Sequence, residues 1–563
     1  MFSEDGALSI VFNGEMYNFQ SVRADLEARG HTFRTHSDTE VILAAYRAWG
    51  ADCVTRFNGM FALALWDRNR RCLFAARDRL GKKPFYYAAS DKRLLFASEL
   101  KALLEVPDLA REVNPAALHE FLSRSIIGGG RTIYRDVRAL PPGHRLVWTE
   151  GALRVERYWT LRFEAEEPAR SEDEYLEELT EHLRESVRLR MISDVPLGAF
   201  LSGGIDSSIV VALMASLSSR PVKTFTIGFD EPGYSEIEDA RVVARHLGTD
   251  HTEHVVKPDA IGILGELAWH YDEPFGDSSM IPTYYVCAMA RREATVALSG
   301  DGGDEVFAGY VRYRRALEGQ RWSTIPAWVR KGLIGPLAAG LPMEAPARNF
   351  LHALAHHRPE APGYGLGMYP YIRDDLLAPE FKRQAAAAWK AEPVVAPAAP
   401  LPADLVTRLQ AMDTAAYLPE DILVKVDRAS MAHSLEVRAP FLDYKLVEFM
   451  ARVPRSLKLR DGVSKYLLRR LGRRLLPESV FTKAKQGFAV PKGAWFKREL
   501  RTVARERLLD PRARTRGYFR SGKVERILRA HESGARDYSD WIWCLLVLEE
   551  WHRTFLDPDT RRV

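Results

Sequence analysis

The sequence contains few cysteines, and none of them form a pair at metal-binding spacing. The four cysteines, Cys53, Cys72, Cys287 and Cys544, lie far apart in a chain of 563 residues. This distribution excludes a Cys-x-x-Cys zinc ribbon and disfavours a disulfide framework. It is typical of a protein that works in a reducing compartment, so we expect a cytoplasmic location.

The sequence also lacks a long hydrophobic run and a marked excess of one charge. Its most apolar stretch, near residues 332–343, is interrupted by glycine and proline and is shorter than the ~20 residues that span a bilayer. The first residues include acids at Glu4 and Asp5 and do not resemble a signal peptide. The 80 basic and 75 acidic residues give a net charge of +5, too little for a nucleic-acid-binding surface. We therefore expect neither a membrane nor a nucleic-acid partner.

What the sequence does contain is two regions with different strand patterns. In the first region, apolar runs predict strands at residues 7–12, 61–66, 72–76, 85–88 and 94–97. We expect a tight turn at Asn13-Gly14 and helices at about residues 19–30 and from Ser37 onward. Consecutive strands without helices between them indicate an antiparallel sheet.

In the second region, apolar strands alternate with helices. Strands are expected at residues 195–201, 222–229, 254–256 and 295–298, and helices at residues 173–190, 207–217 and 236–247. This alternation predicts a doubly wound parallel α/β sheet with helices on both faces. Beyond about residue 320 the pattern is mostly helical and includes a packing helix from Trp541, and we interpret the Ala/Pro-rich segment Ala385 to Pro402 as a loop or linker.

We therefore predict an α/β chain of four consecutive parts. Residues 1–110 form a first domain, residues 111–170 a connecting segment, residues 171–500 the parallel-sheet domain, and residues 501–563 a helical extension.

A glycine-rich loop follows the first strand of the second region. The residues Ser202-Gly203-Gly204-Ile205-Asp206-Ser207-Ser208 lie between that strand and a helix, where parallel sheets bind their ligands. The glycines permit a sharp turn, and the serines with the first N–H groups of the helix suit phosphate oxygens. No lysine stands at the Walker A position, which disfavours a P-loop kinase or GTPase. The alternative is an ordinary capped strand-to-helix turn.

A second loop carries three carboxylates. This loop follows another apolar strand and reads Ser299-Gly300-Asp301-Gly302-Gly303-Asp304-Glu305. Its acids are therefore expected at the same edge of the sheet as the glycine-rich loop. Carboxylates beside phosphates need a cation between them, so the sequence predicts a Mg²⁺ site, for which we assign Asp206 and Asp304 as ligands. A solvated acidic loop without a metal is the alternative.

Together with four further motifs, these loops resemble the glutamine-hydrolysing asparagine synthetase family. The further motifs are Asn13 to Asn18, Ser37 to Glu40, Arg77 to Pro84 and Glu436 to Asp443. The resemblance implies an N-terminal-nucleophile glutaminase domain of the αββα type, a synthetase domain of the ATP-pyrophosphatase type and an ammonia tunnel between them. It further implies that ATP activates aspartate as β-aspartyl-AMP and that ammonia converts this intermediate to asparagine. The implied cofactors are ATP and Mg²⁺, and a homodimer is the implied assembly.

The resemblance also implies roles for individual residues. Leu201 and Ile227 would flank adenine and ribose, Lys465 would neutralise the leaving pyrophosphate, and Asp301 stands where well-known members have glutamate. We assign Asp301 and Lys465 as catalytic residues. The implied ATP- and pyrophosphate-binding residues are Leu201, Ser202, Gly203, Gly204, Asp206, Ser207, Ile227, Ser299 and Gly300.

In the first domain, Asn13, Gly14, Glu15 and Asp38 match the residues that hold glutamine in the family. The family's nucleophile is a cysteine at the start of the mature chain, whereas this sequence starts with Met1 and has its first cysteine at Cys53. We therefore expect the chain as written not to use glutamine. Two explanations are open, a start codon placed too late or a natural form that uses free ammonia. The resemblance implies that a front segment is missing, which includes the cysteine and the first strands of the domain. We favour the first explanation, because a sheet that lacks strands exposes an edge and an apolar face.

The two loops do not specify which carboxylate is amidated. An amidotransferase for a surface-polysaccharide uronic acid or a β-lactam precursor would use the same ATP chemistry. A nucleotide-binding regulatory protein is a third interpretation, but the carboxylates Asp301 and Asp304 argue against it because binding alone does not need an acidic metal cluster.

Overall fold

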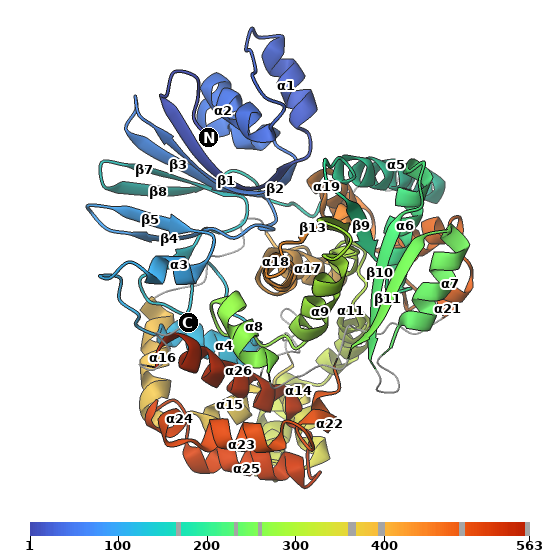
Figure 1. The fold of residues 1–563 in the computed structure, drawn as a ribbon. Coiled ribbons are helices and arrows are strands. Elements are labelled where there is room, and N and C mark those ends of the chain that lie inside the picture. Colours follow the sequence, from blue (N-terminus) through green and yellow to red (C-terminus); the bar gives the residue numbers. More distant parts are fainter. Residues whose placement is uncertain are drawn as a thin grey trace.

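The computed structural model describes residues 1–164, 170–229, 235–256, 262–357, 368–391, 400–482 and 490–557. Two β-sheets of the N-terminal region, a parallel sheet and a mostly helical region lie around the central helices α17 (Leu405–Met412) and α18 (Leu423–Met431) (Figure 1). The central helices therefore face all three parts of the molecule.

The N-terminal region is a sandwich of two antiparallel sheets. The larger sheet has the order β1 (Leu8–Met16), β2 (Gly59–Asp67), β3 (Cys72–Arg77), β7 (His144–Thr149) and β8 (Ala152–Arg157). The smaller sheet has the order β5 (Leu94–Ala97), β4 (Tyr86–Ala89) and β6 (Arg138–Ala139). The prediction of antiparallel pairing is confirmed.

Strand β2 shows why this sandwich forms. Its large side chains Phe61, Leu63 and Leu65 share a buried cluster with residues of α2 (Asp38–Trp49), which covers the outer face together with α1 (Phe19–Glu27). Its alternate residues Ala62 and Ala64 share another buried cluster with residues of the second sheet. Because side chains alternate between the two faces of a strand, large residues face the helices and small ones allow the sheets to approach.

The predicted turn at Asn13-Gly14 is wrong. Strand β1 continues through both residues to Met16, with Asn13 opposite Ala62 and Gly14 opposite Phe61. A Cβ atom added at Gly14 would lie 2.7 Å from the Phe61 Cα atom. The glycine therefore permits close approach of two strands, which is its other common role in a sheet.

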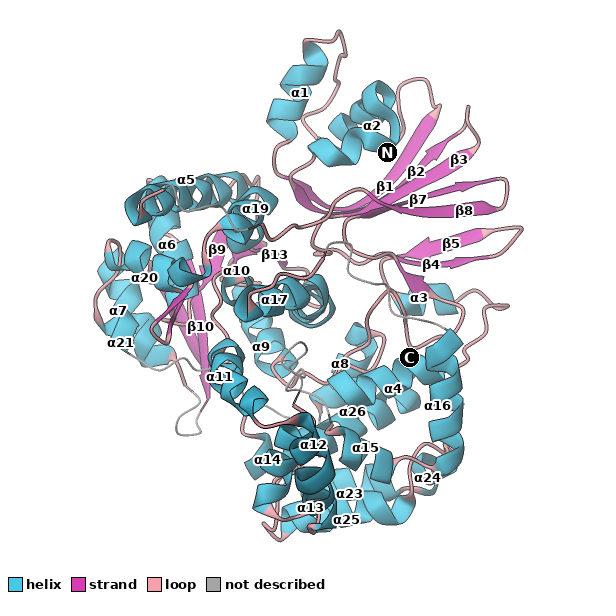
Figure 2. Ribbon diagram, turned by 180° about the vertical axis from the view of Figure 1, so that it is seen from behind, coloured by secondary structure: helices cyan, strands magenta, loops and turns pink. Residues whose placement is uncertain are grey.

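The second region contains a fully parallel sheet. Its order is β11 (Asp250–Val256), β10 (Lys223–Phe229), β9 (Leu197–Phe200), β12 (Val296–Leu298) and β13 (Glu436–Arg438). Helices α5 (Glu172–Arg190), α6 (Ile205–Leu217) and α7 (Ile237–Leu247) cover one face, and α9 (Met280–Ala290) and α18 cover the other (Figure 2). The predicted doubly wound α/β fold is confirmed.

The parts predicted as connection and linker contain regular structure. Strands β6, β7 and β8 come from the predicted connecting segment 111–170 and extend the two N-terminal sheets. Helix α16 (Pro379–Ala391) occupies the first part of the predicted linker, because its alanines favour helix and Phe381 and Ala385 are buried. Residues 392–399 of that linker lie outside the described residues. The proposed domain boundaries stay a prediction.

The remaining elements form the helical part and its connections. Helix α26 (Ser539–Phe555) confirms the predicted packing helix, with Trp543 and Trp551 fully buried. Within the described ranges, no helix combines the length and the apolar character needed to cross a membrane. The remaining bounds are α3 (Leu100–Leu104), α4 (Pro115–Arg124), α8 (Ile263–Tyr271), α10 (Gly303–Val306), α11 (Val311–Gly319), α12 (Ala327–Val329), α13 (Gly335–Gly340), α14 (Pro346–Ala355), α15 (Pro370–Leu376), a π-helical segment (Asp413–Ile422), α19 (Tyr444–Arg452), β14 (Leu459–Arg460), β15 (Val463–Ser464), α20 (Tyr466–Arg473), α21 (Ser479–Thr482), α22 (Lys492–Trp495), α23 (Arg501–Leu509), α24 (Pro511–Thr515), α25 (Ser521–Glu532) and α26 (Ser539–Phe555).

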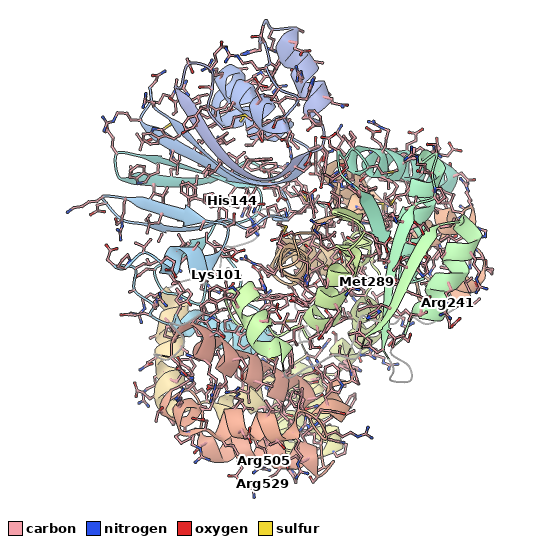
Figure 3. All side chains as sticks on the ribbon, viewed as in Figure 1. Lys101, His144, Arg241, Met289, Arg505 and Arg529 are labelled. Atoms are coloured by element: carbon pink, nitrogen blue, oxygen red, sulfur yellow. The ribbon has the colours of Figure 1, made fainter. Side chains whose placement is uncertain are left out.

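Buried polar contacts join the N-terminal sandwich to the rest of the molecule. Lys101, labelled in Figure 3, directs its Nζ to Asp272 Oδ1 at 3.0 Å. Lys83 Nζ lies 2.8 Å from Asp427 Oδ1. Since these side chains come from opposite sides of the junction, the two regions are fixed in one relative orientation.

Candidate active site

The two predicted loops meet at the point where the chain changes direction in the parallel sheet. From β9 the chain proceeds through β10 to β11 on one side, and it later returns to the other side of β9 as β12. The loop Ser202–Ser207 follows β9 and the loop Ser299–Asp304 follows β12. In open α/β sheets, ligands bind in the crevice between the carboxyl ends of two such strands.

Glycines allow the two loops to touch. A Cβ atom added at Gly300 would lie 2.9 Å from the Ser207 nitrogen, and one added at Gly303 would lie 2.7 Å from Asp206 Cγ. No side chain fits at either position without movement of the neighbouring loop. The structure therefore brings Asp206, Ser207 and Gly300 together, as the sequence predicted.

The serine loop is built as an open helix N-terminus. Ser202 Oγ and Ser207 Oγ lie 3.0 Å apart, and Ser207 Oγ also accepts the Ser202 N–H at 3.2 Å. Gly203 has φ +74°, and Gly204 occupies the N-cap of α6 without a side-chain hydrogen bond to the helix. The positive end of the α6 dipole is therefore available to an anion beside two hydroxyl groups.

Lys465 lies between one carboxylate from each loop. Its Nζ contacts Asp206 Oδ2 and lies 2.7 Å from Asp304 Oδ1, and the residue is only 5% exposed. Burial alone would lower the pKa of Lys465, but the two carboxylates outweigh it and raise the pKa above its usual value. The lysine is therefore a fixed positive charge at the crevice.

Asp301 is held by the serine that precedes it. Its Oδ2 accepts a hydrogen bond from Ser299 Oγ at 2.7 Å, and the Ser299 N–H is donated to the Arg438 carbonyl at 2.9 Å. Burial raises the pKa of Asp301 above its usual value, although Ser299 and the charge of Lys425 act in the opposite direction. Both donors of Ser299 are thus used within the protein, and its binding of a nucleotide stays a prediction.

Leu201 directly follows β9 and Ile227 lies in β10, and both are buried. Leu201 is 1% exposed and its N–H is donated to the Phe225 carbonyl at 2.9 Å. Ile227 is 3% exposed. It lies in β10, two residues after Phe225, which pairs with Phe200 at the end of β9. Leu201 belongs to the buried cluster that includes α6, whereas Ile227 belongs to the cluster that includes α9, so the two predicted residues pack on different faces of the parallel sheet.

The residues predicted to hold glutamine lie at the end of β1 and the start of α2. The Met16 N–H is donated to Asp38 Oδ2 at 2.9 Å, and Asn13 Nδ2 is donated to Ser98 Oγ at 3.1 Å. Glu15 Oε2 lies 3.5 Å from Arg438 Nη2. Burial raises the pKa of Glu15 to about 7 in spite of this arginine. Glu15 therefore faces the parallel-sheet domain through Arg438.

The residues present fit a Mg²⁺ ion that is shared with a phosphate ligand. Asp206 and Asp304 both reach the single ammonium group of Lys465, so their oxygens converge on one point. Magnesium is often held by one or two carboxylates plus substrate phosphates. Among the described residues, no set of three His, Cys, Asp or Glu side chains could hold a metal ion on its own. A metal at this site would therefore need oxygens from the ligand.

A polar cluster beside the acidic loop was missed by the sequence analysis. Lys425 Nζ lies 3.1 Å from Asp277 Oδ2 and 2.9 Å from Ser279 Oγ. Asp421 lies one helical turn before Lys425 and is fully buried. Asp421 and Lys425 are visible in the sequence as charged residues in helical segments, but nothing in the sequence indicates that Asp277, in the loop before α9, contacts Lys425.

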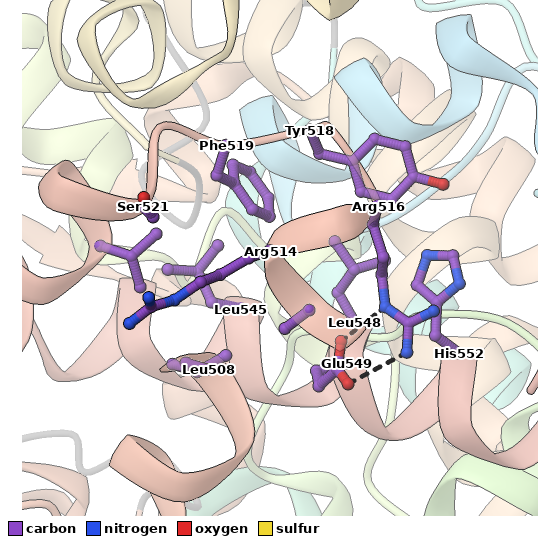
Figure 4. A pocket seen from close by; sticks show the side chains of 12 residues that line it. Leu508, Arg514, Arg516, Tyr518, Phe519, Ser521, Leu545, Leu548, Glu549 and His552 are labelled. Atoms are coloured by element: carbon purple, nitrogen blue, oxygen red, sulfur yellow. Dashed lines mark hydrogen bonds and ion pairs between the residues drawn. The ribbon is translucent and has the colours of Figure 1, made fainter. Parts of the chain in front are cut away.

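A separate cavity lies in the helical C-terminal part (Figure 4). Its walls include Leu508, Leu545 and His552, and the Arg516 guanidinium beside it is bound by Glu549 at 2.7 and 3.0 Å. Because this guanidinium is already neutralised, it offers little charge to a ligand. The cavity does not include any residue that the sequence predicted for a site.

Comparisons with known proteins agree with this arrangement. The model of the asparagine synthase family matches residues 178–553, and that of the glutamine amidotransferase domain matches residues 1–159. Asparagine synthetase [glutamine-hydrolyzing] 1 of Bacillus subtilis is 33% identical over 98% of this chain and 86% of its own length. A putative asparagine synthetase [glutamine-hydrolyzing] of Mycobacterium tuberculosis is 35% identical, with 97% and 84% covered. Amidase chry2 of Gibberella zeae is 28% identical, with 87% and 78% covered.

These matches extend over both the antiparallel and the parallel sheets and include both loops of the crevice. The chain therefore belongs to the asparagine synthase family.

Proposed function

We propose that the protein amidates L-aspartate to L-asparagine with ATP, through β-aspartyl-AMP, and releases AMP and pyrophosphate. Glutamine or free ammonia is the nitrogen donor. The observation that carries this proposal is the meeting of the serine loop, the acidic loop and Lys465 at one crevice. It combines phosphate-binding donors, a fixed cation and carboxylates in the place where α/β sheets bind nucleotides.

The serine loop and Lys465 would bind the pyrophosphate portion of ATP. Ser202, Ser207 and the N-terminus of α6 provide hydrogen-bond donors, and Lys465 provides positive charge where the leaving group gains negative charge. Asp206 and Asp304 would hold Mg²⁺, which when bound neutralises further phosphate charge. The aspartate side-chain carboxylate would attack the α-phosphorus and release pyrophosphate.

Asp301 would serve the second half-reaction. When ammonia attacks the acyl carbon, AMP leaves and the new amide nitrogen must lose a proton. A partly buried carboxylate with a raised pKa, held in place by Ser299, is suited to accept that proton. Asp301 would thereby connect formation of the amide to the crevice where the adenylate forms.

The ATP-binding residues do not identify the acid that is amidated. Amidation of another carboxylate, such as a uronic acid or a β-lactam precursor, is therefore the alternative, and it uses the same crevice. One of the relatives is named an amidase and not an asparagine synthetase.

The test is release of pyrophosphate from ATP in the presence of Mg²⁺ and ammonium, with different acids supplied. The proposal expects pyrophosphate, AMP and asparagine in equal amounts when aspartate is present. Pyrophosphate that forms only with another acid would support the alternative, and none with any acid would refute both.

A further inference from the structure

The cavity in the helical C-terminal part has a largely apolar wall (Figure 4). Leu508 of α23, Val524 of α25, and Leu545 and Leu548 of α26 contribute to it, and all four are buried. The space between the wall atoms is about 430 Å³, and part of it is open to solvent. Ligand cavities are typically apolar, with a few polar groups that fix the orientation of the ligand. The polar groups of this wall therefore indicate what the cavity can bind.

His552 is a buried polar group of the wall that the protein leaves without a hydrogen bond. It is 3% exposed, and among the described residues neither of its ring nitrogens has a partner. Its ring centroid lies 5.4 Å from that of Tyr518 and 4.8 Å from that of Trp551. A buried polar group without a partner costs free energy, which a ligand with a suitable hydrogen-bonding group would recover.

The imidazole of His552 is uncharged at neutral pH. Burial, and after it the charge of Arg516, lowers the pKa of His552 to about 3. One ring nitrogen of a neutral imidazole donates a hydrogen bond and the other accepts one. A hydroxyl group can bond to either nitrogen, whereas a carboxylate can only accept. A hydroxyl is therefore the better partner for His552.

A positive charge without a counter-ion lies at another part of the wall. Arg514 of α24 lines the cavity and is exposed, and within the described chain its guanidinium forms no ion pair and no hydrogen bond. Ser521 lines the cavity as the first residue of α25, a helix of 12 residues that begins without a capping side-chain hydrogen bond. A guanidinium, a hydroxyl and a free helix N-terminus together favour a carboxylate.

The remaining charges of the wall are already neutralised. Arg516 binds Glu549 at 2.7 and 3.0 Å and Asp557 at 3.0 and 3.1 Å. Glu549 also accepts the Arg553 Nε hydrogen at 2.8 Å. Among the described residues that line the cavity, Arg514 is thus the charge that a ligand can still neutralise.

The two polar parts of the wall are separated by apolar side chains. In the view of Figure 4, Arg514 and Ser521 lie at one side of the cavity and His552 lies at the other, with Leu545 and Leu548 between them. A ligand that contacts both parts therefore needs a charged group and a hydroxyl group joined by an apolar body.

We infer that this cavity binds a small hydroxy carboxylate, with its carboxylate at Arg514 and Ser521, its apolar body along the leucines and its hydroxyl group at His552. The cavity is separate from the candidate active site, because its lining does not include Lys465 or any residue of the loops Ser202–Ser207 and Ser299–Asp304. Its ligand is therefore neither the nucleotide nor the acid that is amidated.

The test is isothermal titration calorimetry with 4-hydroxybutanoate, 6-hydroxyhexanoate and 8-hydroxyoctanoate, which differ only in the length of the apolar body. We expect at least one of the three to bind with a Kd below about 1 mM. The acid of the same length without the hydroxyl group, and the alcohol without the carboxylate, should each bind about tenfold more weakly or worse, because a site that hydrogen-bonds a polar group rejects analogues that lack it. Saturating ATP with Mg²⁺ should leave the Kd unchanged, because the two sites are separate.

Two variants test the two ends of the ligand. Arg514→Gln removes the charge of an exposed side chain and should weaken binding of the hydroxy acid about tenfold or more. His552→Phe keeps an aromatic ring beside Trp551 and should abolish the preference for the hydroxyl group without lowering the melting temperature, because no hydrogen bond within the described protein is lost. Arg512→Gln is the matched control, since Arg512 is an exposed arginine of the same helix that does not line the cavity.

Four results would overturn the inference. The first is that none of the three hydroxy acids binds at concentrations up to about 10 mM. The second is an unchanged Kd in Arg514→Gln, or an equal loss in Arg512→Gln, because the carboxylate would then not lie at Arg514. The third is a preference for the hydroxyl group that persists in His552→Phe. The fourth is displacement of the hydroxy acid by ATP, which would place it in the crevice of the parallel sheet.

Discussion

At the scale of single residues, the crevice depends on a buried charge balance around Lys465. We expect Lys465→Ala to lower kcat for exchange of pyrophosphate into ATP by about 100-fold or more, since one stabilising charge at a developing anion commonly has that effect. The substitution would also leave Asp206 and Asp304 facing the phosphates without the cation that separates them. The measurement is initial-rate exchange at saturating ATP.

Lys523→Ala is the control for this prediction. Lys523 is a lysine of the surface, 34% exposed, that pairs with Asp375 at 2.8 Å. Its loss should leave exchange unchanged. Full activity in Lys465→Ala would remove this lysine from the reaction.

Asp421 allows a second prediction, of stability, which does not depend on catalysis. Its folded-state pKa of about 8 lies above the ordinary value of 3.8, so the folded protein holds the proton more tightly than the unfolded chain. Stability contributed by this proton is complete below about pH 4 and is lost as the pH rises to about 8. The variant Asp421→Asn does not lose stability in this way, because asparagine does not ionise in this pH range. We expect its melting temperature to exceed that of the wild type at pH 8.5 and the difference to shrink at pH 5.

The size of this effect is bounded by the pKa difference. Each unit corresponds to about 1.4 kcal/mol, so the advantage of asparagine in the free energy of unfolding can reach ~5 kcal/mol at pH 8.5. Differential scanning fluorimetry at both pH values measures it. A variant that is equally less stable at both values would show that Asp421 is ionised and paired in the free protein.

At the scale of elements, the loops Ser202–Ser207 and Ser299–Asp304 contact each other because glycines leave room between them. Gly300→Ala would place a Cβ atom 2.9 Å from the Ser207 nitrogen, which is part of the backbone and cannot move without shifting the start of α6. We expect the KM for ATP to rise about tenfold or more, a loss of at least ~1.4 kcal/mol in binding. Exchange rates measured over a range of ATP concentrations test this.

The matched control is Gly265→Ala. Gly265 lies in α8, and a Cβ atom there would have no described heavy atom within 4 Å. Alanine in a helix is more favourable than glycine by about 1 kcal/mol, so this variant should bind ATP normally and be slightly more stable. Equal KM values for the two variants would contradict the role of close loop contact.

The elements also show what the sequence can predict. Strand β5 (Leu94–Ala97) and helix α5 were predicted nearly to the residue, because an apolar run and a capping box at Ser171 and Glu174 are local signals. Strand β13 was not predicted, since its three residues are too few to show a period. The Asn13-Gly14 pair was misread because a local turn signal was overridden by pairing with β2.

For the site as well, local sequence patterns predict some features and miss others. The two loops of the crevice were predictable because they follow strands, and parallel strands place their carboxyl ends at one edge. The role of Lys465 came only from resemblance, and its pairing with Asp206 and Asp304 was not predicted and is shown by the structure. The contact of Asp277, just before α9, with Lys425 of α18 depends on packing between distant segments, which no local pattern reports.

At the scale of the whole molecule, the two sheet regions share buried charges. Asp443, which precedes α19, accepts Asn58 Nδ2 from the N-terminal sandwich at 2.8 Å and Arg190 Nη1 from α5 at 2.9 Å. Burial raises the pKa of Asp443, but Arg190 and Asn58 outweigh it and hold the pKa below its usual value. The carboxylate is therefore charged at neutral pH and links both regions.

We expect Asp443→Asn to destabilise the molecule as a whole. Arg190 is fully buried, and loss of its counter-charge leaves an unpaired guanidinium, which typically costs about 3 to 5 kcal/mol of unfolding free energy. Glu185→Gln is the control, because Glu185 and its partner Arg188 are 55% and 52% exposed and such pairs contribute less than about 1 kcal/mol. Scanning calorimetry should show a large fall in melting temperature for the first variant and almost none for the second. Equal shifts would mean that Asp443 does not hold the two regions together, and that the contacts of Lys83 and Lys101 are sufficient for this.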